Sequence, residues 1–432
     1  MTDHPEPTSR ALRRRGWLDR SGQLAMLVGL VVFGVASYVF LTLSARALGP
    51  ARFGQVSVLW AALYLLGSGL FVPLEQELGR SIAARIARGS SSGSLARRVA
   101  AIGLGAYGVV AVATLAASGP LADALFRGER SFVVVGLVGV GGVGAMFFAR
   151  GLLAGSGRYH ALGLLFVVDS LAKCVPTAAL AIAGVTDPIA YGIVLAVSFF
   201  VAPLALYPLL RRAEIDEPGP VPEWSPLASS LGFLLLTSFL SSAVVNIGTI
   251  AVEVLAAPDE QAEAGAFLSG LVIARIPLFL FQAVQAVVLP HLSALAAAGS
   301  MAAFGRSVRQ LALAMAAATL GSTAAMAVLG PPLVRVLFGS DFALLDAGDL
   351  ALLTLASMLF TCALLIGQAQ IALHHQRQTS PPWFAAAIAF VVVTALWGPE
   401  LFARVELGMV AAGLVATLCG GWLLRSEMRQ AD

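Results

Sequence analysis

The sequence predicts an all-α integral membrane protein with about twelve transmembrane helices. A helix that crosses a bilayer needs about 20 mostly apolar residues, and apolar runs of about this length recur along the chain. Hydrophobic residues make up 58% of the 432 and charged residues only 12%, whereas soluble domains carry about 25% charged residues. The mean hydropathy is +0.87. Lipid offers no partners to backbone groups, so these runs are expected to be helices.

The first half of the chain contains six predicted spans, at residues 24–43, 54–72, 99–118, 132–148, 161–183 and 189–210. A polar, arginine-rich segment precedes the first run, and no small-residue cleavage site follows it. We therefore expect an uncleaved first span.

The second half contains six more predicted spans, at residues 227–252, 266–289, 311–329, 350–373, 383–397 and 407–424. The run at 383–397 is the shortest of these. Connections between spans are short, so no separate soluble domain is expected.

Arginine placement predicts that both termini lie in the cytoplasm. With the N-terminus inside, nineteen arginines fall in inner segments and six in outer loops. The outer six are Arg46, Arg52, Arg127, Arg130, Arg335 and Arg404. Basic residues favour the cytoplasmic side, and an even number of spans returns the chain to the side where it began.

A short internal match suggests a duplicated unit. PLADALF at residues 120–126 follows the third span, and PLVRVLF at 332–338 follows the ninth, with four identities in seven. The alternative is coincidence in a low-complexity apolar chain. With duplication, residues 1–210 and 227–432 form two pseudo-symmetric six-helix lobes around a central cavity, joined by a cytoplasmic linker at 211–226. Repeats of this kind underlie many secondary transporters.

The only lysine of the chain, Lys173, lies inside the fifth span, four residues after Asp169. A charge at the bilayer centre costs about 2.5–3.5 kcal/mol on insertion scales, so it is expected to face a partner, a cavity or a substrate. Two interpretations stay open: a structural ion pair, or a site where Lys173 contacts an anionic group that Asp169 helps to release. The acid-first i,i+4 order suits helical pairing.

Arg275 lies in the middle of the eighth predicted span and is the strongest candidate for substrate contact. No carboxylate lies one turn away, Pro277 is placed to interrupt the helix, and Gln282 and Gln285 follow near the same face. A guanidinium matches phosphate better than an ammonium does. The alternative is an interhelical bridge, with Asp169 as a candidate partner.

Four further polar residues are candidates for the functional site. Glu77 and Arg80 are spaced to pair at the inner end of the second span, which leaves Glu75 freer. These three are gate candidates or a solvated helix end. Asn246, the only asparagine, is a cavity donor or part of a helix–helix hydrogen bond.

Several classes of function lack support in the sequence. His374 and His375 have no Cys, Asp or Glu at ligand spacing, so we expect no metal site and no cofactor. The GxGxxG spelling at 139–144 lies inside an apolar run without the strand that a dinucleotide site requires. No hydrolytic constellation, Walker loop or basic–aromatic stretch is present, so neither an enzyme nor a nucleic-acid-binding protein is expected.

Four segments resemble the polysaccharide flippases, the Wzx-like branch of the MOP superfamily, which also holds lipid II flippases and MATE exporters. They are ARALGPARFG at 45–54, PLEQELGR at 73–80, the stretch from RIP at 275–277 to LPHL at 289–292, and LFGSDF at 337–342. Twelve spans fit this branch better than lipid II flippases, which look like fourteen-span proteins. The first span has fewer polar residues than related flippases place there.

The resemblance implies a transporter of the bacterial plasma (inner) membrane that works by alternating access. Its cargo would be an undecaprenyl-diphosphate-linked oligosaccharide for cell-surface polysaccharide biosynthesis, with the lipid tail left in the bilayer and H⁺ or Na⁺ as the coupling ion. Arg275 and Lys173 match the cationic residues expected to hold the diphosphate.

Two alternatives remain beside the flippase. A cation-coupled multidrug exporter of MATE type would use Asp169 as its coupling acid. A membrane-embedded glycan polymerase or ligase would carry a large outer loop with catalytic charges, and no outer loop here is that long.

Overall fold

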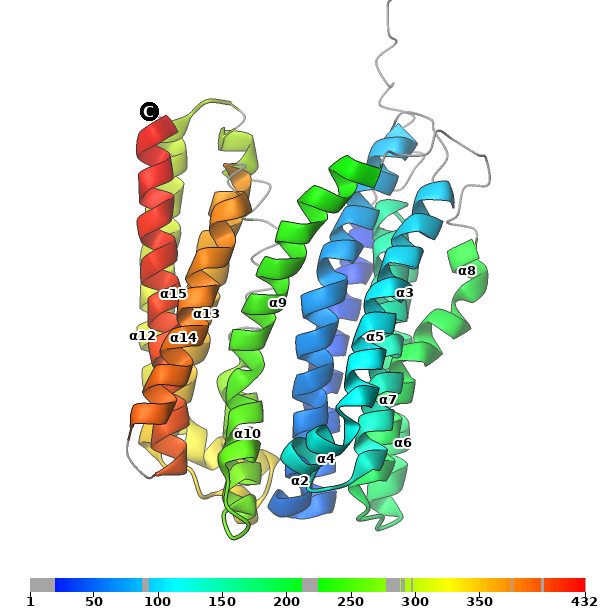
Figure 1. Ribbon diagram of the computed structural model, residues 1–432, viewed down its shortest axis with the longest axis vertical. Helices are drawn as coiled ribbons and strands as arrows, with labels where there is room; N and C mark the ends of the chain where they lie inside the picture. Colours follow the sequence, from blue (N-terminus) through cyan, green and yellow to red (C-terminus); the bar gives the residue numbers. More distant parts are fainter. Residues whose placement is uncertain are drawn as a thin grey trace, which may run out of the picture. The chain divides into compact units, whose positions relative to one another are not determined.

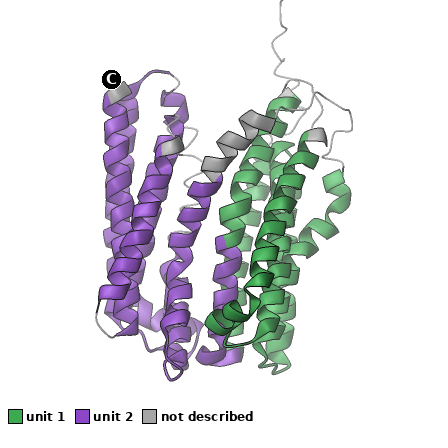
Figure 2. Ribbon diagram, in the orientation of Figure 1, with its two compact units in different colours: residues 1–47, 66–232 green, residues 48–65, 233–432 purple. Residues whose placement is uncertain are grey.

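The computed structural model describes residues 20–87, 93–211, 224–276, 288, 292–296, 298–373, 376–397 and 400–431. These residues are almost entirely helical, and no strand occurs among them. The chain divides into two compact units, the first formed by residues 1–47 and 66–232 and the second by 48–65 and 233–432 (Figure 2).

The longest element, α2 (Arg20–Ala87), contains both of the first two predicted spans. Gly49 separates them, with a non-helical φ of 71° and ψ of 168°. Such a positive φ is readily adopted only without a Cβ. The turn between these spans is therefore a single break in an otherwise helical segment.

Unit 1 is completed by six more helices, which are drawn from cyan to green in Figure 1. They are α3 (Gly93–Ala116), α4 (Ser118–Phe126), α5 (Arg130–Gly155), α6 (Tyr159–Ile182), α7 (Pro188–Ala205) and α8 (Tyr207–Arg211). Helices α5 and α2 pack closely through glycines: a Cβ on Gly155 would lie 2.8 Å from the carbonyl oxygen of Gly79. Small residues of this kind let helix backbones approach.

Unit 2 contains the helices of the second half of the chain, from green to red in Figure 1. They are α9 (Trp224–Leu255), α10 (Gln261–Ala274), α12 (Met301–Leu337), α13 (Ala347–Ala372), α14 (Ser380–Leu396) and α15 (Leu401–Ala431), with short 3₁₀ turns η1 (Ser340–Phe342) and η2 (Gln376–Thr379). α9 begins at Trp224, near the end of the predicted linker at 211–226, and residues 212–223 of that linker lie outside the described residues.

Nine helices among the described residues are long and apolar enough to cross a membrane. One of these is α2, which holds two predicted spans. Two shorter apolar helices lie at further predicted spans: α14 matches the eleventh, and α10 covers the first part of the eighth, most of whose remainder lies outside the described residues. These helices indicate a multi-pass membrane protein and confirm the predicted all-α class.

The repeated heptapeptide ends in an aromatic contact in each unit. Phe126, the last residue of α4, stacks on Phe132 with ring centroids 5.1 Å apart. Phe338, directly after α12, lies 5.8 Å from the ring of Phe342, and Phe53 packs edge-on against Phe342 at 5.7 Å. The two contacts differ in geometry, because the rings of Phe126 and Phe132 are stacked whereas those of Phe338 and Phe342 are tilted by 48°, and the duplication stays a prediction.

Candidate functional site

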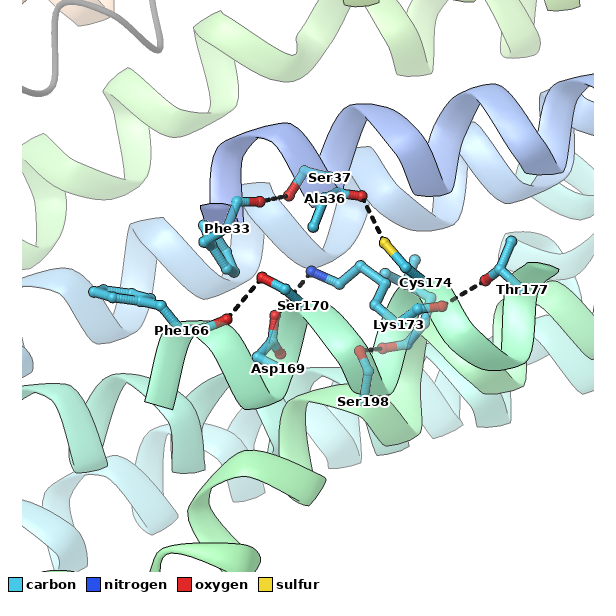
Figure 3. A network of polar contacts seen from close by, with 11 residues as sticks. Phe33, Ala36, Ser37, Phe166, Asp169, Ser170, Lys173, Cys174, Thr177 and Ser198 are labelled. Atoms are coloured by element: carbon cyan, nitrogen blue, oxygen red, sulfur yellow. Dashed lines mark hydrogen bonds and ion pairs between the residues drawn. The ribbon is translucent and has the colours of Figure 1, made fainter. Parts of the chain in front are cut away.

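The pair predicted from its i,i+4 spacing is formed in unit 1. The Nζ atom of Lys173 lies 3.0 Å from Oδ2 of Asp169, and both side chains are 0% exposed (Figure 3). Both residues lie on α6. The two residues therefore form an ion pair in the interior of the unit, and whether the pair is structural or contacts a substrate stays a prediction.

Aromatic rings from two neighbouring helices surround the ammonium. Lys173 Nζ lies 4.7 Å from the ring centroid of Phe33 on α2 and 5.2 Å from that of Phe199 on α7. Aromatic faces attract desolvated cations, by about 2 kcal/mol in favourable cases. The rings therefore stabilise the charge and help to join α6 to α2 and α7.

The carboxylate of Asp169 has one oxygen that makes no hydrogen bond among the described residues. This oxygen, Oδ1, is buried. The nearby hydroxyls of Ser170 and Thr177 donate instead to carbonyls of their own helix, at 2.7 Å each (Figure 3). One carboxylate oxygen is thus available to a proton or to a donor brought in by a change of conformation.

A second ion pair in unit 1 was missed by the sequence interpretation. Nε of Arg150 on α5 lies 3.0 Å from Oε1 of Glu75 on α2, so Glu75 is not the freer carboxylate that we expected. Arg150 also stacks over Phe147 and Phe166, at 4.6 and 5.4 Å. The missed signal was the apolar GLLAG that follows Arg150, which extends α5 to Gly155 and places the arginine inside a helix.

The pairing predicted at the end of the second span is present. Arg80 Nη2 lies 2.7 Å from Oε2 of Glu77, and the side chain of Arg80 is 74% exposed. Ser81 also donates to Glu77, at 2.6 Å. The side chain of Glu77 is only 8% exposed, so its carboxylate is held by Arg80 and Ser81 at a partly buried helix end; a gate role stays a prediction.

Arg275 and Asn246 are brought together in unit 2. Nη1 of Arg275 donates to Oδ1 of Asn246 at 3.3 Å, and its Nη2 donates to the carbonyl of Val245. The amide nitrogen of Asn246 donates to Ser242 O, one turn earlier on α9, at 2.9 Å. That bond fixes the amide so that its oxygen points at the guanidinium.

Arg275 lies at an interruption of the helix. It directly follows α10, which ends at Ala274, and Ile276 is helical again. Helices often end before a proline, and Pro277 follows. Gln282 and Gln285, together with Pro277, lie outside the described residues.

Comparisons with known proteins address the fold. No family model matches the chain. An uncharacterized protein of Mycobacterium tuberculosis is 25% identical over 414 residues, covering 93% of this chain and 89% of that protein. A second uncharacterized protein of the same organism is 27% identical over 390 residues, covering 87% and 85%.

Solved structures with a similar fold cover nearly the whole chain. An inward-facing multidrug resistance MATE family transporter of the MOP superfamily has a TM-score of 0.74 at 14% identity, covering 94% of this chain and 98% of that one. The chain therefore has the MATE fold. An outward-facing MATE transporter scores 0.64 at 17% identity, covering 95% and 96%, and the bent form of the Vibrio cholerae MATE transporter VcmN scores 0.61 at 16%, covering 97% of each.

The MATE fold agrees with the predicted architecture of two helical lobes. Because identities of this size concern the fold alone, neither the cargo nor the Wzx-like branch follows from these matches. The geometry adds two polar centres, one within each unit: the buried Asp169–Lys173 pair and the Arg275–Asn246 pair.

Proposed function

We propose that this protein is a membrane transporter that moves a lipid-diphosphate-linked oligosaccharide from the cytoplasmic to the outer leaflet of the bacterial inner membrane by alternating access. The observation that carries the proposal is the fold, which nearly the whole chain shares with MATE transporters captured in both inward- and outward-facing conformations. Two-lobe transporters of this kind work by moving one repeat against the other.

The chemistry at Arg275 supports an anionic cargo. A guanidinium presents a planar fork that binds phosphate through two parallel hydrogen bonds. Here two of its contacts are to neutral oxygens, those of Asn246 and Val245. Such acceptors orient the guanidinium, and we propose that Arg275 binds the diphosphate of a lipid-linked sugar. Gln282 and Gln285 are proposed to contact the sugars.

Lys173 takes a different role in this proposal from that of Arg275. Its side chain is 0% exposed and paired with Asp169, so a substrate can reach it only after α6 moves away from Phe33 and Phe199. We assign direct contact with the diphosphate to Arg275 and leave the Asp169–Lys173 pair to stabilise unit 1. Glu75, Glu77 and Arg80 stay gate candidates.

The flippase proposal is tested in a strain that lacks the gene. Loss of the protein should leave the lipid-linked oligosaccharide in the cytoplasmic leaflet of spheroplasts, out of reach of an added glycosidase. Arg275→Ala should fail to restore access, whereas Arg309→Ala, which removes an exposed arginine on α12, should restore it. Normal access in the deletion strain contradicts the proposal.

A cation-coupled multidrug exporter is the second candidate, favoured by the free Oδ1 of Asp169 and by MATE transporters with the same fold. In that case Asp169 accepts the coupling proton. Deletion would then raise sensitivity to cationic drugs while leaving the leaflet distribution of the glycan unchanged.

A further inference from the structure

Unit 2 contains a buried carboxyl group, that of Glu406, whose surroundings do not stabilise a negative charge. Glu406 on α15 is 1% exposed, and its Oε1 has no hydrogen-bond partner among the described residues. An ionised carboxylate in such a position costs far more free energy than a neutral carboxyl.

The charged groups nearest to Glu406 increase this cost. Asp349 and Asp346, at the start of α13, act on it as like charges. Both belong to a capping box: Asp346 accepts hydrogen bonds from the backbone N–H groups of Gly348 and Asp349, and Asp349 accepts one from Asp346. The start of a helix favours negative charge, and these two acids offer no positive charge to Glu406.

The other helices around Glu406 supply no counter-ion in the part of the chain that the structure describes. α14 carries no charged residue, and α9, whose Gly248 packs against Met409 of α15, carries Glu253, another acid. The nearest cation on α15 is Arg404, whose Nε donates to the carbonyl of Thr394 at 3.2 Å.

A metal ion is a poor candidate for neutralising a negative charge on Glu406. The described residues contain no group of three or more His, Cys, Asp or Glu that could hold one. A proton needs only one carboxylate oxygen, and Glu406 has one without a partner.

We propose that Glu406 is a proton-binding site of unit 2 and that it carries a proton in the conformation of this structure. The proton forms an O–H bond on one carboxylate oxygen and is taken from or returned to water, so no other reactant is required. A carboxyl that is neutral when buried and ionises in water couples proton release to any movement that opens this end of the unit. The inference does not depend on what is transported.

Infrared spectroscopy of the purified full-length protein tests the proposal. The wild-type protein at neutral pH should show a protonated-carboxyl C=O band that disappears in Glu406→Gln and persists in Glu400→Gln, a change at an exposed acid shortly before α15. A wild-type spectrum whose protonated-carboxyl bands are all kept in Glu406→Gln overturns the proposal.

Thermal unfolding gives an independent test of the protonation of Glu406. Two different substitutions are compared, so that the test does not depend on one variant that folds poorly. At about pH 4, where the carboxyl is largely protonated in the folded and the unfolded protein alike, Glu406→Gln and Glu406→Leu should unfold at about the wild-type temperature. As the pH rises to neutral, the wild type should lose stability relative to both variants, because the unfolded chain then releases the proton that the folded protein keeps. Stabilisation of the wild type by Na⁺ or K⁺, absent in Glu406→Gln, would show that a cation occupies the site and would overturn the proposal.

Discussion

Removing the carboxylate from the ion pair of unit 1 should strongly destabilise the protein. In Asp169→Asn, the ammonium of Lys173 stays in an interior where its side chain is 0% exposed, and it loses the carboxylate of Asp169. Breaking a buried pair in this way costs about 3–5 kcal/mol, because it leaves an uncompensated charge.

The surroundings of Lys173 set the expected value within that range. The rings of Phe33 and Phe199, at 4.7 and 5.2 Å, remain in place and continue to attract the ammonium. We therefore expect about 3 kcal/mol, the lower end of the range. Since every 1.4 kcal/mol is a factor of ten, the ratio of folded to unfolded protein should fall by roughly a hundredfold.

A double-mutant cycle isolates this effect from other consequences of the substitution. Asp169→Asn, Lys173→Met and the double variant are purified in detergent, and their unfolding is followed by intrinsic fluorescence. Both single variants should be destabilised, and the double variant should recover most of the loss because it buries no charge. Single variants that unfold like the wild type would refute the assignment of a structural pair.

Three further changes give smaller or more specific effects. Glu75→Gln should cost about 1 kcal/mol or less, because its partner Arg150 and the carboxylate are both partly exposed and such pairs are weak; a loss as large as that of Asp169→Asn would contradict this. Asn246→Asp should convert the hydrogen bond to Arg275 into an ion pair, leaving the unfolding temperature unchanged or higher while weakening binding of a soluble diphosphate lipid analogue, measured by fluorescence titration. Gly155→Val places a branched side chain where a Cβ already lies 2.8 Å from the backbone of α2, so overpacking should lower the free energy of unfolding by about 1–3 kcal/mol, whereas Gly105→Val, which meets nothing within 4 Å, should not.

Much of the fold could be predicted from composition and periodicity. A bilayer requires long apolar helices, so the runs along the chain already determined the helical class and the approximate position of nearly every element. The i,i+4 spacing of Asp169 and Lys173 and the i,i+3 spacing of Glu77 and Arg80 predicted their pairing, because neighbours on one helix are fixed by its geometry.

Contacts between helices could not be predicted in the same way. The pairing of Glu75 with Arg150 joins α2 to α5, and no spacing within one sequence segment reports such a contact. The same holds for Asn246, which meets Arg275 across 29 positions of the chain. The fourth predicted span ends at residue 148, whereas α5 continues to Gly155 and so contains Arg150.

Reconstitution tests the central claim most directly. Vesicles containing the purified protein and a fluorescent undecaprenyl-diphosphate oligosaccharide are exposed to a membrane-impermeant quencher. We expect the wild type and Arg309→Ala to bring the label from the inner to the outer leaflet, and Arg275→Ala to leave the inner fraction protected although it inserts normally. Equal movement of the label in vesicles with Arg275→Ala, or in vesicles without protein, would contradict the account.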